Sequence, residues 1–141
     1  MPVSTFLITA VVVGLVVNMF DFLVHGLLLQ GPVYSKIPLM RTDFSVPLIV
    51  LVDFVAAAVF VWVYQRVRAS FPPGAAGGAT FGLYAGVLVN FPTWIAAYLT
   101  LSGFTYGLAW VWIITGIMWG MLAGAVTGAL VSRSARPSAA A

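Results

Sequence analysis

Four long apolar stretches dominate this sequence and restrict what the chain can fold into. They cover residues 3–29, 46–67, 79–101 and 106–131. Each is long enough to cross the hydrocarbon core of a bilayer, which takes about 20 mostly apolar residues in a helix. Because lipid cannot hydrogen-bond a backbone, such a span has to be helical. The sequence predicts an all-α membrane protein, one integral membrane domain over residues 1–141 that forms a four-transmembrane-helix bundle.

The composition excludes several classes of function. Of the 141 residues, 62% are hydrophobic and 6% charged, whereas a soluble domain carries roughly 25% charged residues. The lipid bilayer is therefore the expected partner. The basic residues lie at helix ends and in loops, so we expect no nucleic-acid binding. The chain has no cysteine, no glutamate, no Ser-His-Asp arrangement and no phosphate-binding loop after a strand, which favours a non-enzymatic protein.

Basic residues also predict the orientation in the membrane. With four spans, four arginines fall on the side of both termini and two basic residues on the other side: Arg66, Arg68, Arg133 and Arg136 against Lys36 and Arg41. Loops rich in Lys and Arg stay in the cytoplasm. We expect a multi-pass protein of the bacterial inner membrane with both termini cytoplasmic.

Glycines recur at every fourth position in the last two spans. They are Gly74, Gly78, Gly82 and Gly86 in and before the third, and Gly116, Gly120, Gly124 and Gly128 in the fourth. Small residues at this spacing let helix backbones approach closely in a membrane. The pattern predicts a glycine zipper in the cytoplasmic half, either between these two helices or with a second subunit. A homo-oligomer or a larger membrane complex is the expected assembly.

Polar residues interrupt the first span in the segment "NMFDFLVHG". Helical periodicity places Asn18, Asp21 and His25 on one face. An ionisable side chain near the bilayer centre costs at least about 2.5 kcal/mol, so this face should point into the bundle or toward water. Counting along the spans puts Asp53 at a similar depth. We expect the two aspartates and His25 to lie close together.

The third and fourth spans add polar groups at about the same depth. These are Asn90, Thr93 and Thr115, and Pro92 is expected to kink the helix beside them. The sequence thus predicts one polar layer in the outer half, to which all four helices contribute. The connector over residues 31–45 is interpreted as an interfacial loop rather than a lid over this layer.

The two halves of the chain show a faint likeness at an offset of 72 residues. "GLVVNMFDFLVHGLLL" aligns with "GVLVNFPTWIAAYLTL", which pairs Gly14 with Gly86 and Asn18 with Asn90. Two parallel helical-hairpin repeats are a hypothesis that fits this alignment.

Several uses of the polar layer remain open. It can be interhelical hydrogen-bond glue, a pathway for protons, ions or a small solute, or a partner-binding face. Two carboxylates and one imidazole are also enough ligands for a divalent metal, and a lone histidine can give a haem one ligand. Metal and cofactor are therefore left unassigned. The leading hypothesis is an accessory or scaffold subunit of a membrane assembly; the alternative is a small transporter or channel-like protein.

Four segments also show a resemblance to known proteins. "VVNMFDFLVHGLLL", "FVWVYQRV", "FGLYAGVLVNFP" and "GMLAGAVTGALV" together resemble small bacterial four-helix membrane proteins of this length. The resemblance covers nearly the whole chain, and its most specific element is the polar stripe from Asn18 to His25. It implies the four-helix architecture and a role for the stripe, and it implies no activity.

Overall fold

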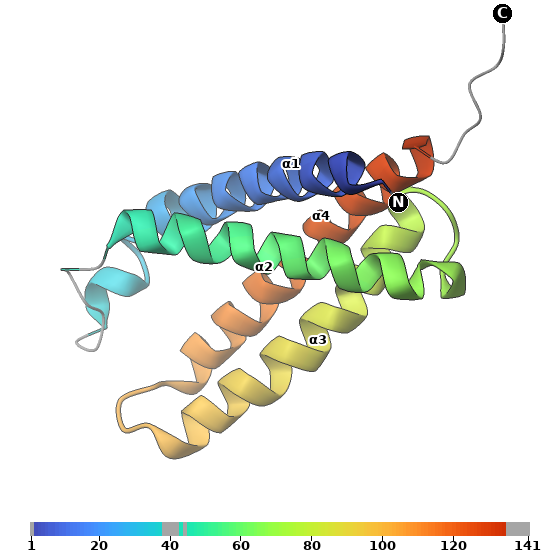
Figure 1. Ribbon diagram of the computed structural model, residues 1–141. Coiled ribbons are helices and arrows are strands. Elements are labelled where there is room, and N and C mark those ends of the chain that lie inside the picture. The colour runs from blue at the N-terminus through green and yellow to red at the C-terminus, as the bar shows by residue number, and fades with distance from the viewer. Residues whose placement is uncertain (1, 38–42, 44, 135–141) are drawn as a thin grey trace, which may run out of the picture.

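The computed structural model describes residues 2–37, 43 and 45–134 of the chain. Over these residues it is an all-α fold with four long helices (Figure 1). They are α1 (Val3–Asp21), α2 (Val46–Val67), α3 (Ala75–Thr100) and α4 (Tyr106–Ser134). The predicted four-helix architecture is therefore confirmed. Arg41 and Arg136, two of the residues used to predict orientation, lie outside the described residues.

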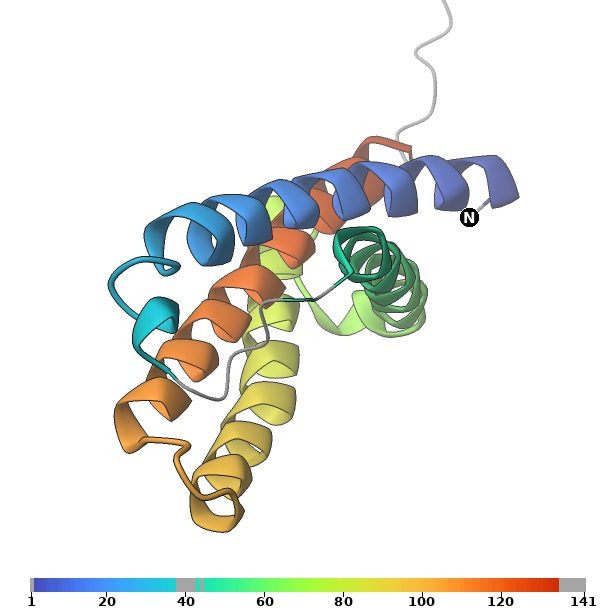
Figure 2. The same ribbon diagram turned by 90° about the vertical axis from the view of Figure 1, so that its left-hand side faces the viewer.

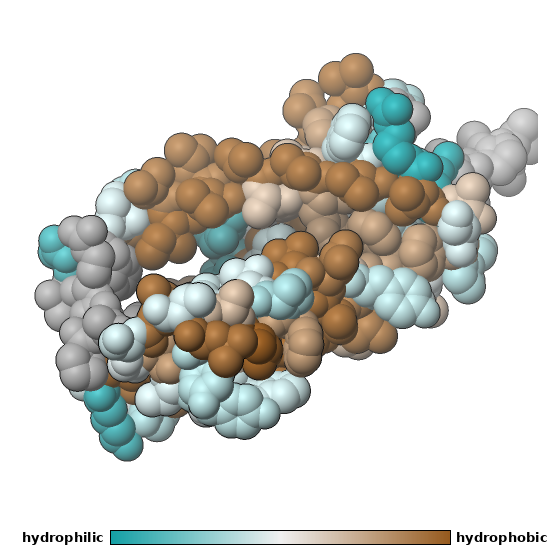
Figure 3. All heavy atoms as spheres, turned by 90° about the horizontal axis from the view of Figure 1, so that it is seen from below, coloured by the Kyte–Doolittle hydropathy of each residue, from teal (hydrophilic) through white to brown (hydrophobic). Residues whose placement is uncertain are grey.

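All four helices are long and apolar enough to cross a membrane. The candidate spans are Val3–Leu28, Val46–Ser70, Ala75–Thr100 and Tyr106–Arg133. Their outer faces are apolar, with side chains such as Leu88 and Leu99 about three-quarters exposed. Figure 3 shows the same property as hydrophobic residues along the flanks of the molecule. Such a surface is suited to lipid.

The first predicted helix differs from the expectation over its last third. The α-helix ends at Asp21, and the chain continues directly into a π-helix, η1 (Phe22–Leu28). In this segment the backbone bonds to the fifth residue back, as Leu29 N does to the Val24 oxygen at 2.8 Å. Two short 3₁₀ turns follow elsewhere, η2 (Tyr34–Lys36) in the first connector and η3 (Arg68–Ser70) after α2. The π-turns are wider than α-turns, so they rotate His25 relative to a continuous α-helix.

The third helix begins four residues earlier than predicted, at Ala75. Gly74 precedes it with a φ of 91°, a conformation that glycine adopts without strain. Its N–H donates to Ser132 Oγ at 2.7 Å, which ties the start of α3 to the end of α4. Gly78, which the prediction places before the third span, is helical and lies against the backbone of Gly124 in α4.

α3 and α4 form a hairpin, whereas α1 and α2 cross each other, since α2 is seen end-on in Figure 2 while α1 runs across the view. α3 and α4 lie side by side along their length, and α1 and α2 run past them at a steep angle (Figures 1 and 2). We call the end where α1 begins and α4 ends the terminal end, and the opposite end the loop end. At the loop end, the turn between α3 and α4 lies apart from the ends of α1 and α2 (Figure 1).

The apolar core lies at the crossing and toward the terminal end. One cluster of buried residues joins α1, α2 and α4, namely Val13, Val17, Ala57, Val61 and Ala123. A second joins α2, α3 and α4 through Tyr64, Phe81 and Val131. Asp21 and His25 lie beyond these clusters, at the end of α1 and in η1. Seen from below, the molecule has an opening between its helices, and hydrophilic atoms lie along its edge (Figure 3).

Candidate functional site

The candidate site is built around Asp21 and His25, where α1 becomes a π-helix. Asp21 is the last residue of the α-helix and His25 lies in the middle of η1. Both side chains are partly buried, with 23% of Asp21 and 33% of His25 exposed. His25 Nε2 lies 3.8 Å from Asp21 Oδ1, within ion-pair range but longer than a hydrogen bond. π-turns inside helices are frequent at functional sites.

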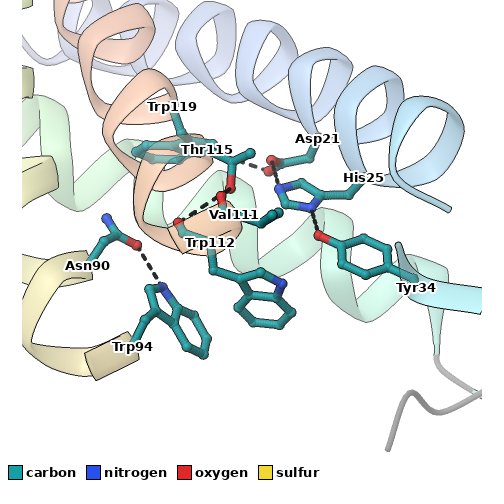
Figure 4. A network of polar contacts seen from close by, with 9 residues as sticks. All are labelled: Asp21, His25, Tyr34, Asn90, Trp94, Val111, Trp112, Thr115 and Trp119. Carbon is teal, nitrogen blue, oxygen red and sulfur yellow. Dashed lines mark hydrogen bonds and ion pairs between the residues drawn. The ribbon is translucent and has the colours of Figure 1, made fainter. Parts of the chain in front are cut away.

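A chain of polar contacts runs from the first connector to α4 through these two residues (Figure 4). Trp119 Nε1 donates to Asp21 Oδ2 at 3.2 Å. On the other side, His25 Nδ1 is hydrogen-bonded to the hydroxyl of Tyr34. The order is therefore Tyr34, His25, Asp21, Trp119, with the imidazole between the phenol and the carboxylate. The chain links the connector, α1 and α4.

Tyr34 reaches the site because the connector folds back over it. Backbone bonds from Val33 N and Tyr34 N to the Leu29 oxygen, both 3.0 Å, close the turn after η1. Tyr34 is 4% exposed, and its ring is nearly parallel to that of His25, with an interplanar angle of 7° and centroids 5.8 Å apart. Burial raises the pKa of Tyr34 to about 12. The described part of the connector thus covers the site, so the interfacial-loop interpretation is wrong for Tyr34.

Asp53 of α2 lies next to Asp21, close enough for the two carboxyl groups to interact. One of its oxygens, Oδ2, is buried and has no hydrogen-bond partner. The indole nitrogen of Trp112, on α4, is likewise buried without a partner. Its ring packs edge-on against His25 and Tyr34, with centroid distances of 6.5 and 6.3 Å. An unpaired acceptor and an unpaired donor therefore border the chain of contacts.

The two asparagines make equivalent bonds within their own helices. Asn18 Nδ2 donates to the Gly14 oxygen, and Asn90 Nδ2 donates to the Gly86 oxygen, both at 2.9 Å. The residues are those that the offset of 72 pairs in sequence. Asn90 also accepts from Trp94 Nε1 at 3.2 Å, on the α3 side of Trp112 (Figure 4). Within the described part of the chain, neither asparagine is hydrogen-bonded to Asp21 or His25.

The two threonines have different surroundings. Thr115 is buried on α4, and its hydroxyl bonds to the Val111 and Trp112 oxygens at 2.9 and 3.3 Å. It lies on the helix face of Trp112 and Trp119 (Figure 4). Thr93 is exposed, and its hydroxyl bonds to the Val89 oxygen at 2.6 Å. The structure does not bring Thr93 to the other polar residues, because depth in a span does not fix the direction of a side chain.

The glycines of α3 and α4 bring the two backbones into direct contact. A Cβ added at Gly120 would lie 2.5 Å from the Gly82 oxygen, and one added at Gly78, Gly124 or Gly128 would collide with the facing backbone. A Cβ at Gly86 would lie 2.9 Å from the Ile117 Cα. At Gly116 the space is filled by the Asn90 side chain. The closest approach is toward the terminal end and occurs within this chain.

The geometry does not favour a metal centre. Among the described residues no three His, Asp or Glu side chains converge to hold a metal ion. Asp21 and His25 face each other, but His25 Nδ1 is engaged by Tyr34. The divalent-metal reading of the two aspartates and His25 is therefore not supported by their arrangement.

Sequence reasoning missed the aromatic partners of the site, Tyr34, Trp94, Trp112 and Trp119. The position of Trp119 in the sequence could have pointed to the site, because it lies well inside a span and not at the interfaces where tryptophan is enriched. A buried indole N–H needs an acceptor, and acceptor side chains are rare in these spans. Tyr34 had no such signal, since nothing local shows that the connector folds back.

No known protein family, curated protein or solved structure matches this chain. Its class therefore rests on its own helices. The four apolar spans and the polar chain between them define a multi-pass membrane protein, a transmembrane helix bundle with an ionisable site inside it.

Proposed function

We propose that this protein is a small transporter or channel-like protein that binds a proton at Asp21 and Asp53 and moves protons, ions or a small solute. The observation that supports this is the chain from Tyr34 through His25 to Asp21, with Asp53 beside it. Ionisable residues within spans are costly and are typical of proton relays and ion pathways. The chain begins in a connector and reaches the centre of the bundle.

The chemistry of the pair favours proton binding. Two neighbouring carboxyl groups repel each other when both are ionised, and one shared proton relieves that repulsion. His25 is the basic group nearest to them, at 3.8 Å from Asp21. Adding a proton forms one O–H bond and removes one negative charge from the bundle. The open Oδ2 of Asp53 gives that proton or a solute donor a place to bind.

Proton flux into proteoliposomes tests the proposal. The purified protein is reconstituted with a pH-sensitive dye inside the vesicles, and a potassium potential drives uptake. Wild type should acidify the lumen, while Asp21→Asn and Asp53→Asn should lower the rate at least tenfold. Asp43→Asn, the third acidic residue of the chain, is the charge-matched control in the connector. Absence of flux from correctly folded wild type, with every ion and solute tried, would refute the proposal.

An accessory or scaffold subunit is the second candidate. It is favoured by one apolar face of α2, on which Val52, Val55, Val59 and Trp62 are each more than half exposed. The glycines of α4 no longer support it, because α3 already occupies them. Purification from native membranes in mild detergent discriminates the two candidates. A stoichiometric partner or homo-oligomer that is lost with Val55→Ser/Val59→Ser, together with zero flux, would replace the transport proposal.

The proposed setting is the bacterial inner membrane with both termini cytoplasmic. Among the described residues, Arg66, Arg68 and Arg133 lie toward the terminal end, and Lys36 lies in the connector at the loop end. Basic residues favour the cytoplasmic side. A fluorescent protein fused to the C-terminus should fluoresce, whereas an alkaline phosphatase fused there should be inactive. The opposite pattern would invert the orientation.

A further inference from the structure

The single histidine of the chain lies between two different partners. Its Nε2 faces the Asp21 carboxylate and its Nδ1 is hydrogen-bonded to the Tyr34 hydroxyl. A neutral imidazole carries one proton, so one ring nitrogen donates and the other accepts. Which ring nitrogen of His25 carries the proton therefore depends on both Asp21 and Tyr34.

The two partners impose different restrictions. An ionised Asp21 can only accept, so it favours a proton on His25 Nε2. Nδ1 must then accept, and the Tyr34 O–H donates to it. A protonated Asp21 carries no charge to attract a proton on Nε2 across the 3.8 Å between them, so the imidazole proton can move to Nδ1. The Tyr34 oxygen accepts in that state, because a phenol can do either.

We infer that Tyr34 is a positioning residue of the proton site: its hydroxyl holds the His25 ring toward Asp21 and pairs with Nδ1 in both tautomers. The inference deepens the proposed function and rests on it for its role in transport. The geometry behind it stands alone, because Tyr34 is 4% exposed, its hydroxyl is hydrogen-bonded to His25 Nδ1 and its backbone is held by the turn to Leu29.

The surroundings leave few other groups to set the tautomer. α1 presents Asp21 to the imidazole, and α2 presents Asp53 to Asp21. α4 presents two indoles, Trp112 against the ring and Trp119 on Asp21, and neither titrates. Lys36 follows Tyr34 closely in sequence, but its side chain is exposed. The Tyr34 hydroxyl is thus the hydrogen-bond partner of Nδ1.

Nitrogen-15 NMR of histidine-labelled protein in bicelles tests this directly, because one imidazole gives all the signals. In wild type at neutral pH, the Nδ1 shift should be that of a hydrogen-bonded ring nitrogen. Tyr34→Phe keeps the ring and removes the hydroxyl. Because the hydroxyl pairs with Nδ1 in both tautomers, its loss leaves Nδ1 without a partner in either one, so the Nδ1 shift should move to that of a ring nitrogen without a hydrogen bond. Tyr84→Phe, on an exposed face of α3, is the matched control.

The outcomes separate this inference from the proposed function. Wild-type shifts of a free Nδ1, or the same Nδ1 shift in wild type and Tyr34→Phe, would overturn it. The wild-type spectrum decides the question even if the variant fails to fold. Zero proton flux together with a Tyr34-dependent Nδ1 shift would refute the transport proposal and leave the positioning role of Tyr34 intact.

Discussion

Replacing Gly120 by alanine should push α4 away from α3 and destabilise the bundle. The added Cβ would lie 2.5 Å from the carbonyl oxygen of Gly82. An ordinary contact needs at least 3.4 Å, so the helices must separate by roughly 1 Å at this level, an overpacking of the kind that strains a packed core. The obstacle is helix backbone, which cannot rotate aside as a side chain can.

The size of the effect follows from two opposing contributions. Overpacking of this kind costs about 1–3 kcal/mol, and alanine regains up to about 1 kcal/mol of helix propensity relative to glycine. We expect Gly120→Ala to lower the free energy of unfolding by about 1–2 kcal/mol. Gly107→Ala is the matched control on the same helix, because its added Cβ meets nothing within 4 Å. It should be neutral or slightly stabilising.

The assay is reversible unfolding in mixed micelles, followed by circular dichroism as the fraction of denaturing detergent rises. Gly120→Ala should unfold at a lower fraction than wild type, and Gly107→Ala at the same fraction or higher. If both variants unfold together with wild type, the close backbone contact between α3 and α4 is not what stabilises the hairpin.

Three further predictions concern single contacts. Trp119→Phe should cost about 0.6–1.7 kcal/mol, the range for hydrogen bonds within membranes, and a double-mutant cycle with Asp21→Ala should recover that coupling; additive effects would contradict it. Gly14→Ala should cost less than Gly120→Ala in the same unfolding assay, because its Cβ meets the Phe54 ring, which can turn. Burial raises the pKa of Tyr34 from 10.0 to about 12, so Tyr34 stabilises the fold below pH 10 and this stabilisation is lost between pH 10 and 12; Tyr34→Phe should flatten stability over that window.

The sequence predicts the spans well because lipid imposes a simple requirement on them. A helix in hydrocarbon must be long, apolar and fully hydrogen-bonded, and each of these properties is local. The spacing of Asp21 and His25 is also local, and the two side chains do face each other. Glycines at every fourth position likewise predict that another helix approaches closely. They do not show which helix it is, and the structure shows that α3 and α4 approach each other.

Features that depend on the path of the chain could not be predicted in the same way. The π-helix from Phe22 to Leu28 changes the hydrogen-bond register without changing the apolar composition. The return of Tyr34 onto His25 depends on how the connector turns. Thr93 lies at a depth that suits the polar layer, yet its side chain is exposed. Depth along a span can be counted from sequence, whereas rotation about the helix axis depends on the neighbours.

The hydrogen bond between Trp119 and Asp21 joins residues 98 positions apart, and this separation has a consequence for biosynthesis. During synthesis α1 enters the membrane first, and its aspartate has no indole donor until α4 has followed. The hairpin of α3 and α4 joins neighbours in sequence, so it can assemble as soon as both helices are inserted. The ionisable site is therefore incomplete until α4 has been inserted, and chains that stop before α4 should expose Asp21 to the membrane quality-control machinery.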